Sequence, residues 1–127
     1  MGANSGQPLG RPQFRKAHFQ KTWASQETTN DYVTLGTVLD KTGFTKCTLQ
    51  IYNTGDTNDI SYKIEGSLDG TNYNISIMGV TVLQESDYDV IDISSLLDDC
   101  YVPYIKILVE STVDDNHSDV EAFAVCV

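Results

Sequence analysis

The sequence lacks the short motifs that mark common enzyme classes. It contains no GxSxG, Walker A, GxGxxG, HExxH or CxxC pattern, so hydrolase, nucleotide-binding, zinc-peptidase and thiol-redox sites have no support. It has only 2 histidines, His18 and His117, and neither has a nearby serine or cysteine in a strand that would form a nucleophile with its base. Paired carboxylates stay open among the 18 acidic residues, although acids in turns are ordinarily solvated surface. We therefore expect a protein that is not an enzyme and has no cofactor.

Long apolar runs are also missing. No stretch approaches the roughly 18 apolar residues of a membrane-spanning helix, and residues 1–20 contain no apolar core of a signal peptide. The first residues nearly fit a myristoylation signal, but Gly6 stands where serine or threonine is needed. The sequence thus predicts neither membrane insertion nor export by a cleaved signal.

Cysteine is scarce, with 3 residues in odd number and without metal-ligand spacing. This pattern is neither a disulfide framework nor a zinc site. Cys47 and Cys126 lie within apolar strand patterns, where a thiol behaves as a small hydrophobe, so buried reduced thiols are the favoured expectation. A single Cys47–Cys126 or Cys100–Cys126 bridge remains the alternative if the strands are neighbours.

Basic residues are few and unevenly placed. The chain has 8 Lys and Arg against 18 Asp and Glu, a net charge of −10. Residues 1–30 hold four basic residues and one acid, a charge of +3, which leaves −13 for residues 31–127. Binding phosphates needs Lys or Arg, so we expect neither nucleic acid nor an anionic membrane as a partner. The basic segment suits an acidic protein surface, including that of a neighbouring copy.

Residues 1–30 show no sustained hydrophobic period and are predicted to form an extended N-terminal arm. Phe14, Phe19 and Trp23 are spaced by five and four positions, which fits neither a strand nor a helix face. Two interpretations have equal weight: the rings anchor the arm on another protein, or they fold back onto the domain's own core. The predicted binding residues of the arm are Arg11, Phe14, Arg15, Lys16, Phe19, Lys21 and Trp23.

Residues 31–127 are predicted to form one domain of short strands. Apolar and polar residues alternate within these segments, as in half-buried strands, and Asp69-Gly70 is a strong hairpin signal. Residues 94–99 alone look helical, as one turn capped by Ser94. Seven to eight evenly spaced strands predict an all-β, antiparallel β-sandwich, Ig-like or jelly-roll-like, with an extended N-terminal arm. The strands are expected at 32–39, 44–52, 60–68, 73–83, 88–93, 103–111 and 119–127.

The acidic loops contain the residue types that bind calcium. Residues 114–119 offer oxygen ligands, but an EF-hand starting at Asp114 would need Gly where Asp119 stands and Glu where Val125 stands. Turn formation by Asp and Asn is the simpler interpretation, so we expect no metal site, and an irregular calcium site at the rim of the loops is the alternative.

The segment YKIEGSLDGTNY at 62–73, preceded by LQIYNTG at 49–55, resembles a pattern in small β-sandwich proteins of tailed-bacteriophage virions, including head-decoration proteins. The resemblance covers about residues 44–127. It implies a non-enzymatic virion structural protein, made in the host cytoplasm, that decorates and stabilises the capsid surface. Such a protein is often a homotrimer whose arm contacts the shell and neighbouring subunits. The implied partners are the major capsid protein and copies of this chain.

The same hairpin also resembles discoidin-type sandwiches, which bind carbohydrate or lipid. The alternative function is therefore a carbohydrate-binding or tail-associated adhesion module, with Tyr73, Tyr101 and Tyr104 stacking on sugars. For Tyr101 and Tyr104, burial at a strand edge is the favoured interpretation.

Overall fold

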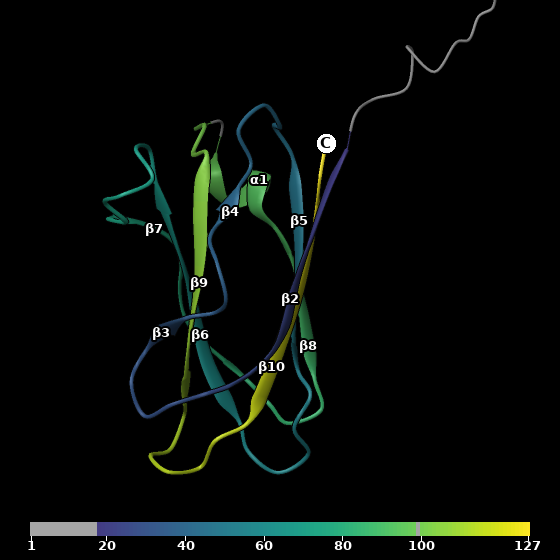
Figure 1. The fold of residues 1–127 in the computed structure, drawn as a ribbon, viewed down its shortest axis with the longest axis vertical. Helices are drawn as coiled ribbons and strands as arrows, with labels where there is room; N and C mark the ends of the chain where they lie inside the picture. The colour runs from purple at the N-terminus through teal and green to yellow at the C-terminus, as the bar shows by residue number, and fades with distance from the viewer. Residues whose placement is uncertain (1–17, 99) are drawn as a thin grey trace, which may run out of the picture.

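The computed structural model describes residues 18–98 and 100–127 as an antiparallel β-sandwich of two facing sheets (Figure 1). The predicted all-β sandwich is thereby confirmed. The elements are β2 (Phe19–Glu27), β3 (Val33–Thr34), β4 (Leu39–Asp40), β5 (Cys47–Asn53), β6 (Ile60–Ser67), β7 (Ile75–Leu83), β8 (Tyr88–Asp92), α1 (Ile93–Leu97), β9 (Tyr104–Ser111) and β10 (Asp119–Cys126).

The strand order identifies the sandwich as a jelly roll. The first sheet runs β2-β10-β5-β8, and the second runs β3-β9-β6-β7 with β4 also paired to β9. With β3 and β4 counted as one interrupted strand, the first sheet holds the first, eighth, third and sixth strands, and the second sheet the remaining four. Two interleaved Greek keys of this order define the jelly roll and not the Ig-like arrangement. The outer strands of the first sheet are β2 and β8.

The core lies between the sheets and follows the expected alternation. In β9, Ile105, Ile107 and Val109 are buried, and Leu49 and Ile51 of β5 face them from the first sheet. Burying one such side chain contributes about 1.5–3 kcal/mol, so the inward residues of both sheets together hold the sandwich closed.

Strand β2 corrects the predicted boundary between arm and domain. Residues 19–27 pair with β10 along its length, so the folded body includes residues that the sequence analysis assigned to the arm. Trp23 is 3% exposed and its Nε1 donates a 2.8 Å hydrogen bond to the carbonyl of Thr37. Phe19, Lys21 and Trp23 occupy alternate positions on one side of the strand, but a lysine in the middle concealed this period of two.

Cys47 and Cys126 form a disulfide with a Cα–Cα distance of 4.1 Å, so the expectation of reduced thiols was wrong for this pair. The two residues lie opposite each other on β5 and β10. Lys46 and Val127 beside them exchange both backbone hydrogen bonds, which places the cysteines in the closer, non-hydrogen-bonded type of pair. The structure thus contains the alternative that the sequence left open, a Cys47–Cys126 bridge between neighbouring strands. Cys100 is a free, exposed thiol.

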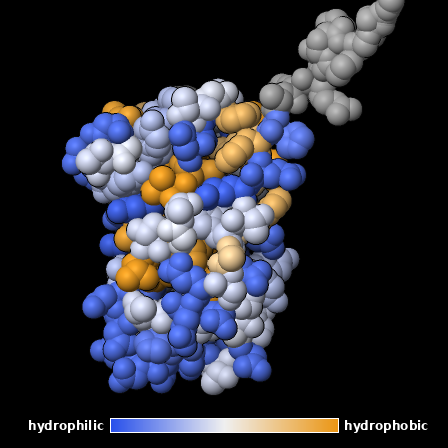
Figure 2. Space-filling view, viewed as in Figure 1, coloured by the Kyte–Doolittle hydropathy of each residue, from blue (hydrophilic) through white to orange (hydrophobic). Residues whose placement is uncertain are grey.

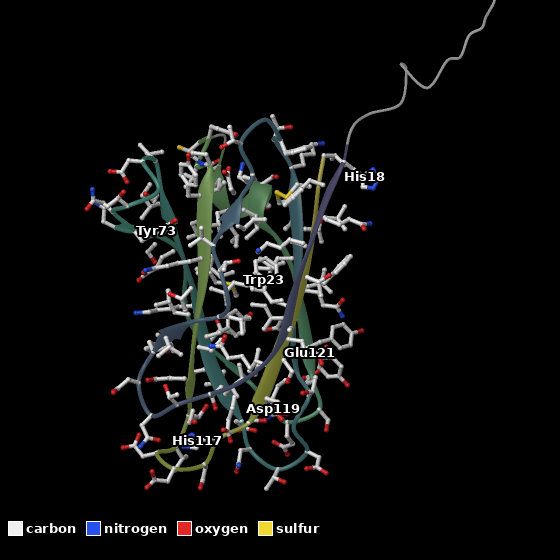
Figure 3. All side chains as sticks on the ribbon, viewed as in Figure 1. His18, Trp23, Tyr73, His117, Asp119 and Glu121 are labelled. Atoms are coloured by element: carbon white, nitrogen blue, oxygen red, sulfur yellow. A yellow bond between two sulfur atoms is a disulfide. The ribbon has the colours of Figure 1, made fainter. Side chains whose placement is uncertain are left out.

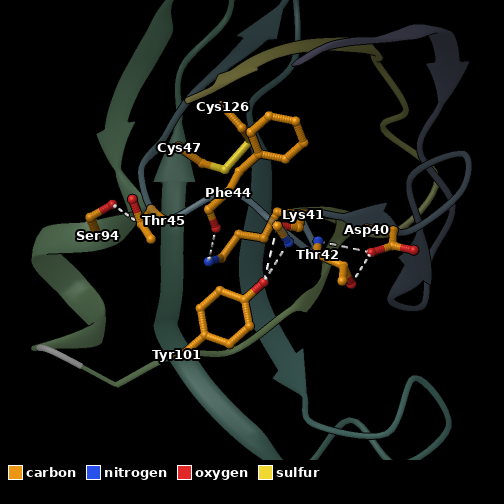
Figure 4. Close-up of a disulfide and its surroundings, with 10 residues drawn as sticks. Asp40, Lys41, Thr42, Phe44, Thr45, Cys47, Ser94, Tyr101 and Cys126 are labelled. Atoms are coloured by element: carbon orange, nitrogen blue, oxygen red, sulfur yellow. Dashed lines mark hydrogen bonds between the residues drawn. A yellow bond between two sulfur atoms is a disulfide. The ribbon is translucent and has the colours of Figure 1, made fainter. Parts of the chain in front are cut away.

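A buried lysine closes the sandwich beside this disulfide (Figure 4). Lys41 is 1% exposed, and its Nζ donates to the Phe44 carbonyl at 3.3 Å and lies 4.3 Å from the Tyr101 ring centroid. Burial holds the pKa of Lys41 below its usual range. The Tyr101 hydroxyl donates to the Lys41 carbonyl and accepts from the Gly43 amide, so the loop after β4 is fixed onto the segment before β9.

The short helix α1 begins at Ile93, and its N-cap lies two residues before the expected Ser94. Asp92 is its N-cap, because its carboxylate accepts from the Ser95 amide, whereas Ser94 donates to the Thr45 carbonyl. No helix within the described ranges is long and apolar enough to cross a membrane.

The two ends of the jelly roll differ in character. Residue 18 and the C-terminus lie at the same end, near α1 (Figure 1). On the face drawn in Figure 2, hydrophilic residues cover the opposite end, while apolar residues reach the surface in the middle and toward residue 18.

Candidate functional site

The outer face of the β2-β10-β5-β8 sheet carries large apolar side chains in water. Tyr52, Tyr88, Val90 and Phe123 are 40%, 53%, 62% and 39% exposed. Thr22, Phe123, Gln50 and Val90 form one cross-strand row, and Glu121, Tyr52 and Tyr88 form the adjacent row. These seven residues are called the outer face below.

A hollow of about 200 Å³ lies within the outer face. Its lining combines the aromatic residues Phe123 and Tyr52 with the polar residues Thr22, Gln50 and Glu121. Tyr52 in turn meets the Tyr88 ring edge-on at a centroid distance of 6.4 Å. Such edge-to-face contact is a favoured geometry for two rings, so Tyr52 is held as one wall of the hollow.

The outer face is acidic as well as apolar. Asp92, Asp119 and Glu121 occupy exposed outward positions, and no lysine or arginine within these four strands does so. Figure 3 shows Asp119 and Glu121 along β10, with Asp119 nearer the end that carries His117. An aromatic surface bordered by carboxylates suits a partner that combines apolar and basic groups.

The lysines of the folded body do little to neutralise its acids. Four of the five described lysines place Nζ over a ring of the same chain: Lys21 over Trp23, Lys41 over Tyr101, Lys63 over Tyr32 and Lys106 over Tyr73. Over the described ranges the one ion pair is Lys63–Glu65, at 3.7 Å. The body therefore presents its negative charge largely unpaired.

A second apolar groove, of about 510 Å³, runs between α1 and β7. Leu68 and Leu96 are exposed along it, and Cys100 lies at its border. Its described lining contains no charged residue, whereas that of the hollow includes Glu121. Nothing in the described residues indicates what would occupy the groove.

The predicted arm residues separate into two groups. Arg11, Phe14, Arg15 and Lys16 lie outside the described residues. Phe19, Lys21 and Trp23 belong to β2, where Phe19 stacks on Phe44 at 5.9 Å and Lys21 donates to the Thr37 hydroxyl.

Trp23 lies between the sheets (Figure 3) and packs within the core. The prediction that Trp23 anchors a partner is corrected, because burial leaves no indole surface for a second protein. The other interpretation, in which the ring folds back onto the domain's own core, is the one that describes this residue. Gly36, at φ +53°, makes room for the ring, since a Cβ there would lie 2.8 Å from its Cδ1.

The three tyrosines considered for sugar stacking are committed to internal contacts. Tyr73 lies under Lys106 with its hydroxyl buried, and Tyr104 packs against Gly70. Tyr101 is exposed along one side but holds the Lys41 loop. Burial at a strand edge, favoured for Tyr101 and Tyr104, does not describe either residue: Tyr104 is partly buried but lies on β9 between β4 and β6, and Tyr101 is 47% exposed.

One serine–histidine contact was not foreseen. Ser111 Oγ lies 2.7 Å from His117 Nδ1 and 2.8 Å from Thr28 Oγ1. Ser111 is 2% exposed, so a substrate has no access to its hydroxyl. The contact continues a buried polar network, in which the Ser118 amide donates to Thr28 Oγ1 and Ser118 Oγ donates to Asn53. The network fixes loops at the polar end.

The loop acids serve turn geometry. Asp69 accepts hydrogen bonds from the backbone amides of Thr71 and Asn72 and from the Ser67 hydroxyl. These bonds, the one from Asn72 first, hold the pKa of Asp69 well below its usual range. Across residues 18–98 and 100–127, no group of three or more His, Cys, Asp or Glu side chains is placed to hold a metal ion.

Sequence reasoning missed the outer face because it used alternation only to find the core. The sequence pattern that indicates it was present. In β10, Ala122 and Ala124 point toward the core, while Phe123 and Val125 point to the other side of the strand. In β8 the outward positions are Tyr88 and Val90. Large apolar residues on the polar side of an alternating strand indicate a second contact surface.

Comparison with known proteins gives a fold and no family. The chain matches no protein-family model and no curated protein sequence. It is similar in structure to a protein from Bacillus endospore appendages, described as a novel family of disulfide-linked pili, with a TM-score of 0.51 over 89% of this chain and 90% of that one. The identity is 6%, so what the likeness supports is the shared β-sandwich architecture.

Proposed function

We propose that this protein is a non-enzymatic structural subunit that assembles with copies of itself on a larger protein surface. The observation that carries the proposal is the outer face, where Tyr52, Tyr88, Val90 and Phe123 stay exposed on one continuous sheet surface. Contiguous apolar patches bordered by polar residues commonly mark protein contacts. Aromatic residues are enriched in protein interfaces and carry much of their binding energy.

The setting that the sequence resemblance implies is the surface of a virion. In that proposal the subunit decorates a capsid, contacts neighbouring copies through the outer face and uses residues 1–17 as the attached arm. The structural similarity to a pilus protein adds a second case in which such a sandwich belongs to a polymer. The Cys47–Cys126 bridge fits a protein that works in an oxidising environment.

The present cysteines argue against a polymer linked by disulfides in this chain. Cys47 and Cys126 are bonded to each other, which leaves Cys100. One thiol per subunit joins two copies and then stops, whereas a covalent chain needs two. The assembly we propose is therefore held by non-covalent contacts.

The test compares the mass of the protein in solution with that of two double variants. Tyr52→Thr with Phe123→Thr removes the walls of the hollow, and we expect light scattering to give a smaller mass than for the unaltered chain at the same concentration. Val80→Thr with Val82→Thr is the matched control, because these valines are 65% and 54% exposed on β7 of the other sheet. Equal masses for all three proteins, or a monomer throughout, would refute the proposal.

A carbohydrate-binding function is the second candidate, and one observation favours it. Tyr52 and Phe123 flank a hollow lined also by Thr22, Gln50 and Glu121, and rings beside hydrogen-bonding groups are suited to sugars. This moves the candidate site from the loop tyrosines to the outer face. Two results together would favour this function over assembly. The unaltered chain would be a monomer, and it would give a reproducible glycan-array signal that disappears in the Tyr52→Thr, Phe123→Thr variant.

A further inference from the structure

We propose that the outer face binds residues 11–17 of a second copy of this chain, with Phe14 in the hollow and Arg15 and Lys16 beside Glu121. The inference rests on the proposed assembly function and names its contact. It identifies a partner segment for a surface that the fold leaves uncovered.

Charge is the first argument. Residues 1–17 hold three basic residues and no acid, a charge of +3, while residues 18–127 hold 5 Lys against 18 acids, a charge of −13. Four of those five lysines lie over rings of their own chain, and the fifth, Lys46, is exposed just before β5. Residues 11–16 therefore supply three of the four remaining cations. Attraction between the segment and the face follows from this division.

The chemistry of the hollow is the second argument. Its walls are the rings of Phe123 and Tyr52, and Glu121 contributes to its lining. An aromatic side chain next to basic residues fits both the aromatic walls and the carboxylate. The ring is buried between the walls, while the neighbouring basic groups approach Glu121. Phe14-Arg15-Lys16 has this order, and Phe19 and Trp23, the other aromatics of the predicted arm, are occupied within the sandwich.

Chain length is the third argument, and it favours a second copy over the same one. Measured along β2 from His18, the hollow begins at the position of Thr22, because Phe123 pairs with Thr22. It extends further from His18, because the other wall, Tyr52, pairs with Glu121, two residues before Phe123 on β10. That is four to six residues from His18, or roughly 13–20 Å along the strand. Phe14 is four residues from His18, a reach of about 14 Å when fully straight, and an immediate reversal of direction would shorten it. A second copy has no such restriction.

Photo-crosslinking of the full chain tests which surface Phe14 touches. A benzoylphenylalanine is placed at position 14, and at position 5 in the control, in an equal mixture of chains with and without ¹⁵N. We expect position 14 to link to peptides covering 48–53 or 119–126 of the other isotopic chain, and position 5 to do so several-fold less. Links confined to the same chain, or to another surface, would overturn the inference.

A charge exchange tests the ionic part. Glu121→Lys alone, and Arg15→Glu with Lys16→Glu, should each weaken association about fivefold, the size of a partly exposed ion pair, and the three changes together should restore most of it. Glu121 is exposed, so the unfolding midpoint of each variant should stay unchanged.

The two tests separate this inference from the function it rests on. If the Tyr52→Thr, Phe123→Thr variant loses assembly while the Arg15→Glu, Lys16→Glu variant keeps it, the outer face binds a different occupant and this inference is wrong. If the unaltered chain is a monomer at every concentration, the proposed function itself fails.

Discussion

Glu121 on β10 and Tyr52 on β5 lie directly opposite each other across the antiparallel ladder, on the side of the sheet that faces water. A carboxylate and an aromatic ring thus share one border of the hollow. Outward positions of a sheet that faces water are ordinarily polar, so a group of exposed rings and valine side chains at these positions indicates a contact surface. The pair gives the outer face its combined apolar and acidic character.

Removing the disulfide should destabilise the sandwich strongly. The bridge spans 79 positions of sequence, and in the chain-entropy treatment closing a loop of that length contributes about 4–5 kcal/mol. We expect Cys47→Ala with Cys126→Ala to lower the free energy of unfolding by most of that amount in urea titrations. Cys100→Ala is the control and should have no such effect; similar midpoints for all three proteins would contradict the account.

Trp23 and Phe14 should behave oppositely when truncated. Trp23→Ala empties a core site and should cost about 3–5 kcal/mol of stability, measured by chemical unfolding. Phe14→Ala should leave stability unchanged and weaken association. The assignment of Trp23 to the core and Phe14 to the interface would be untenable if Trp23→Ala unfolded at the normal midpoint while association disappeared.

Tyr62 joins the two sheets through a polar contact. Its hydroxyl on β6 donates a 2.6 Å hydrogen bond to the Asp89 carboxylate on β8, and burial, followed by this bond, raises the pKa of Tyr62 so that it stays protonated. Tyr62→Phe should lower the free energy of unfolding by about 1–3 kcal/mol, since Asp89 loses its donor. Tyr88→Phe, which removes an exposed hydroxyl, should change it far less; an equal loss in both variants would contradict this role.

The Asp69 turn should make part of the stability depend on pH. Hydrogen bonds hold the pKa of Asp69 in the folded chain below the 3.8 of an ordinary aspartate. The ionised group therefore stabilises the fold above about pH 4, and this contribution is lost as the pH falls below that value. The stability difference between the unaltered chain and Asp69→Ala should be largest near neutral pH and shrink in acid. Asp114→Ala, at another exposed loop carboxylate, controls for loss of charge, and a difference independent of pH would exclude the proposed cause.

The fold class could be predicted because it depends on local patterns. Alternation in Cys47–Asn53 and Tyr104–Ser111, with the Asp69-Gly70 turn between β6 and β7, indicates a sandwich without knowledge of pairing. The jelly-roll order could not be predicted in this way, because strand neighbours such as β2 and β10 come from opposite ends of the chain.

Pairing also decided what the sequence left open about individual residues. The Cys47–Cys126 bridge follows from register alone, since the two cysteines are opposite each other at the same end of β5 and β10. Lys21 interrupts the apolar side of β2, and its position over the Trp23 ring explains how a lysine is accommodated there. This contact between a lysine and a ring on the same side of a strand becomes visible only when the position of the strand in the fold is known.

Hydroxyl-radical footprinting as a function of protein concentration tests the central claim most directly, because it reports which rings become covered. Tyr52 and Tyr88 are 40% and 53% exposed on the outer face, and Tyr101 is 47% exposed elsewhere, so the three start from similar accessibility. We expect oxidation of Tyr52 and Tyr88 to fall as copies assemble, while oxidation of Tyr101 stays constant. Unchanged oxidation of Tyr52 and Tyr88 in a protein whose mass increases with concentration would show that assembly uses another surface.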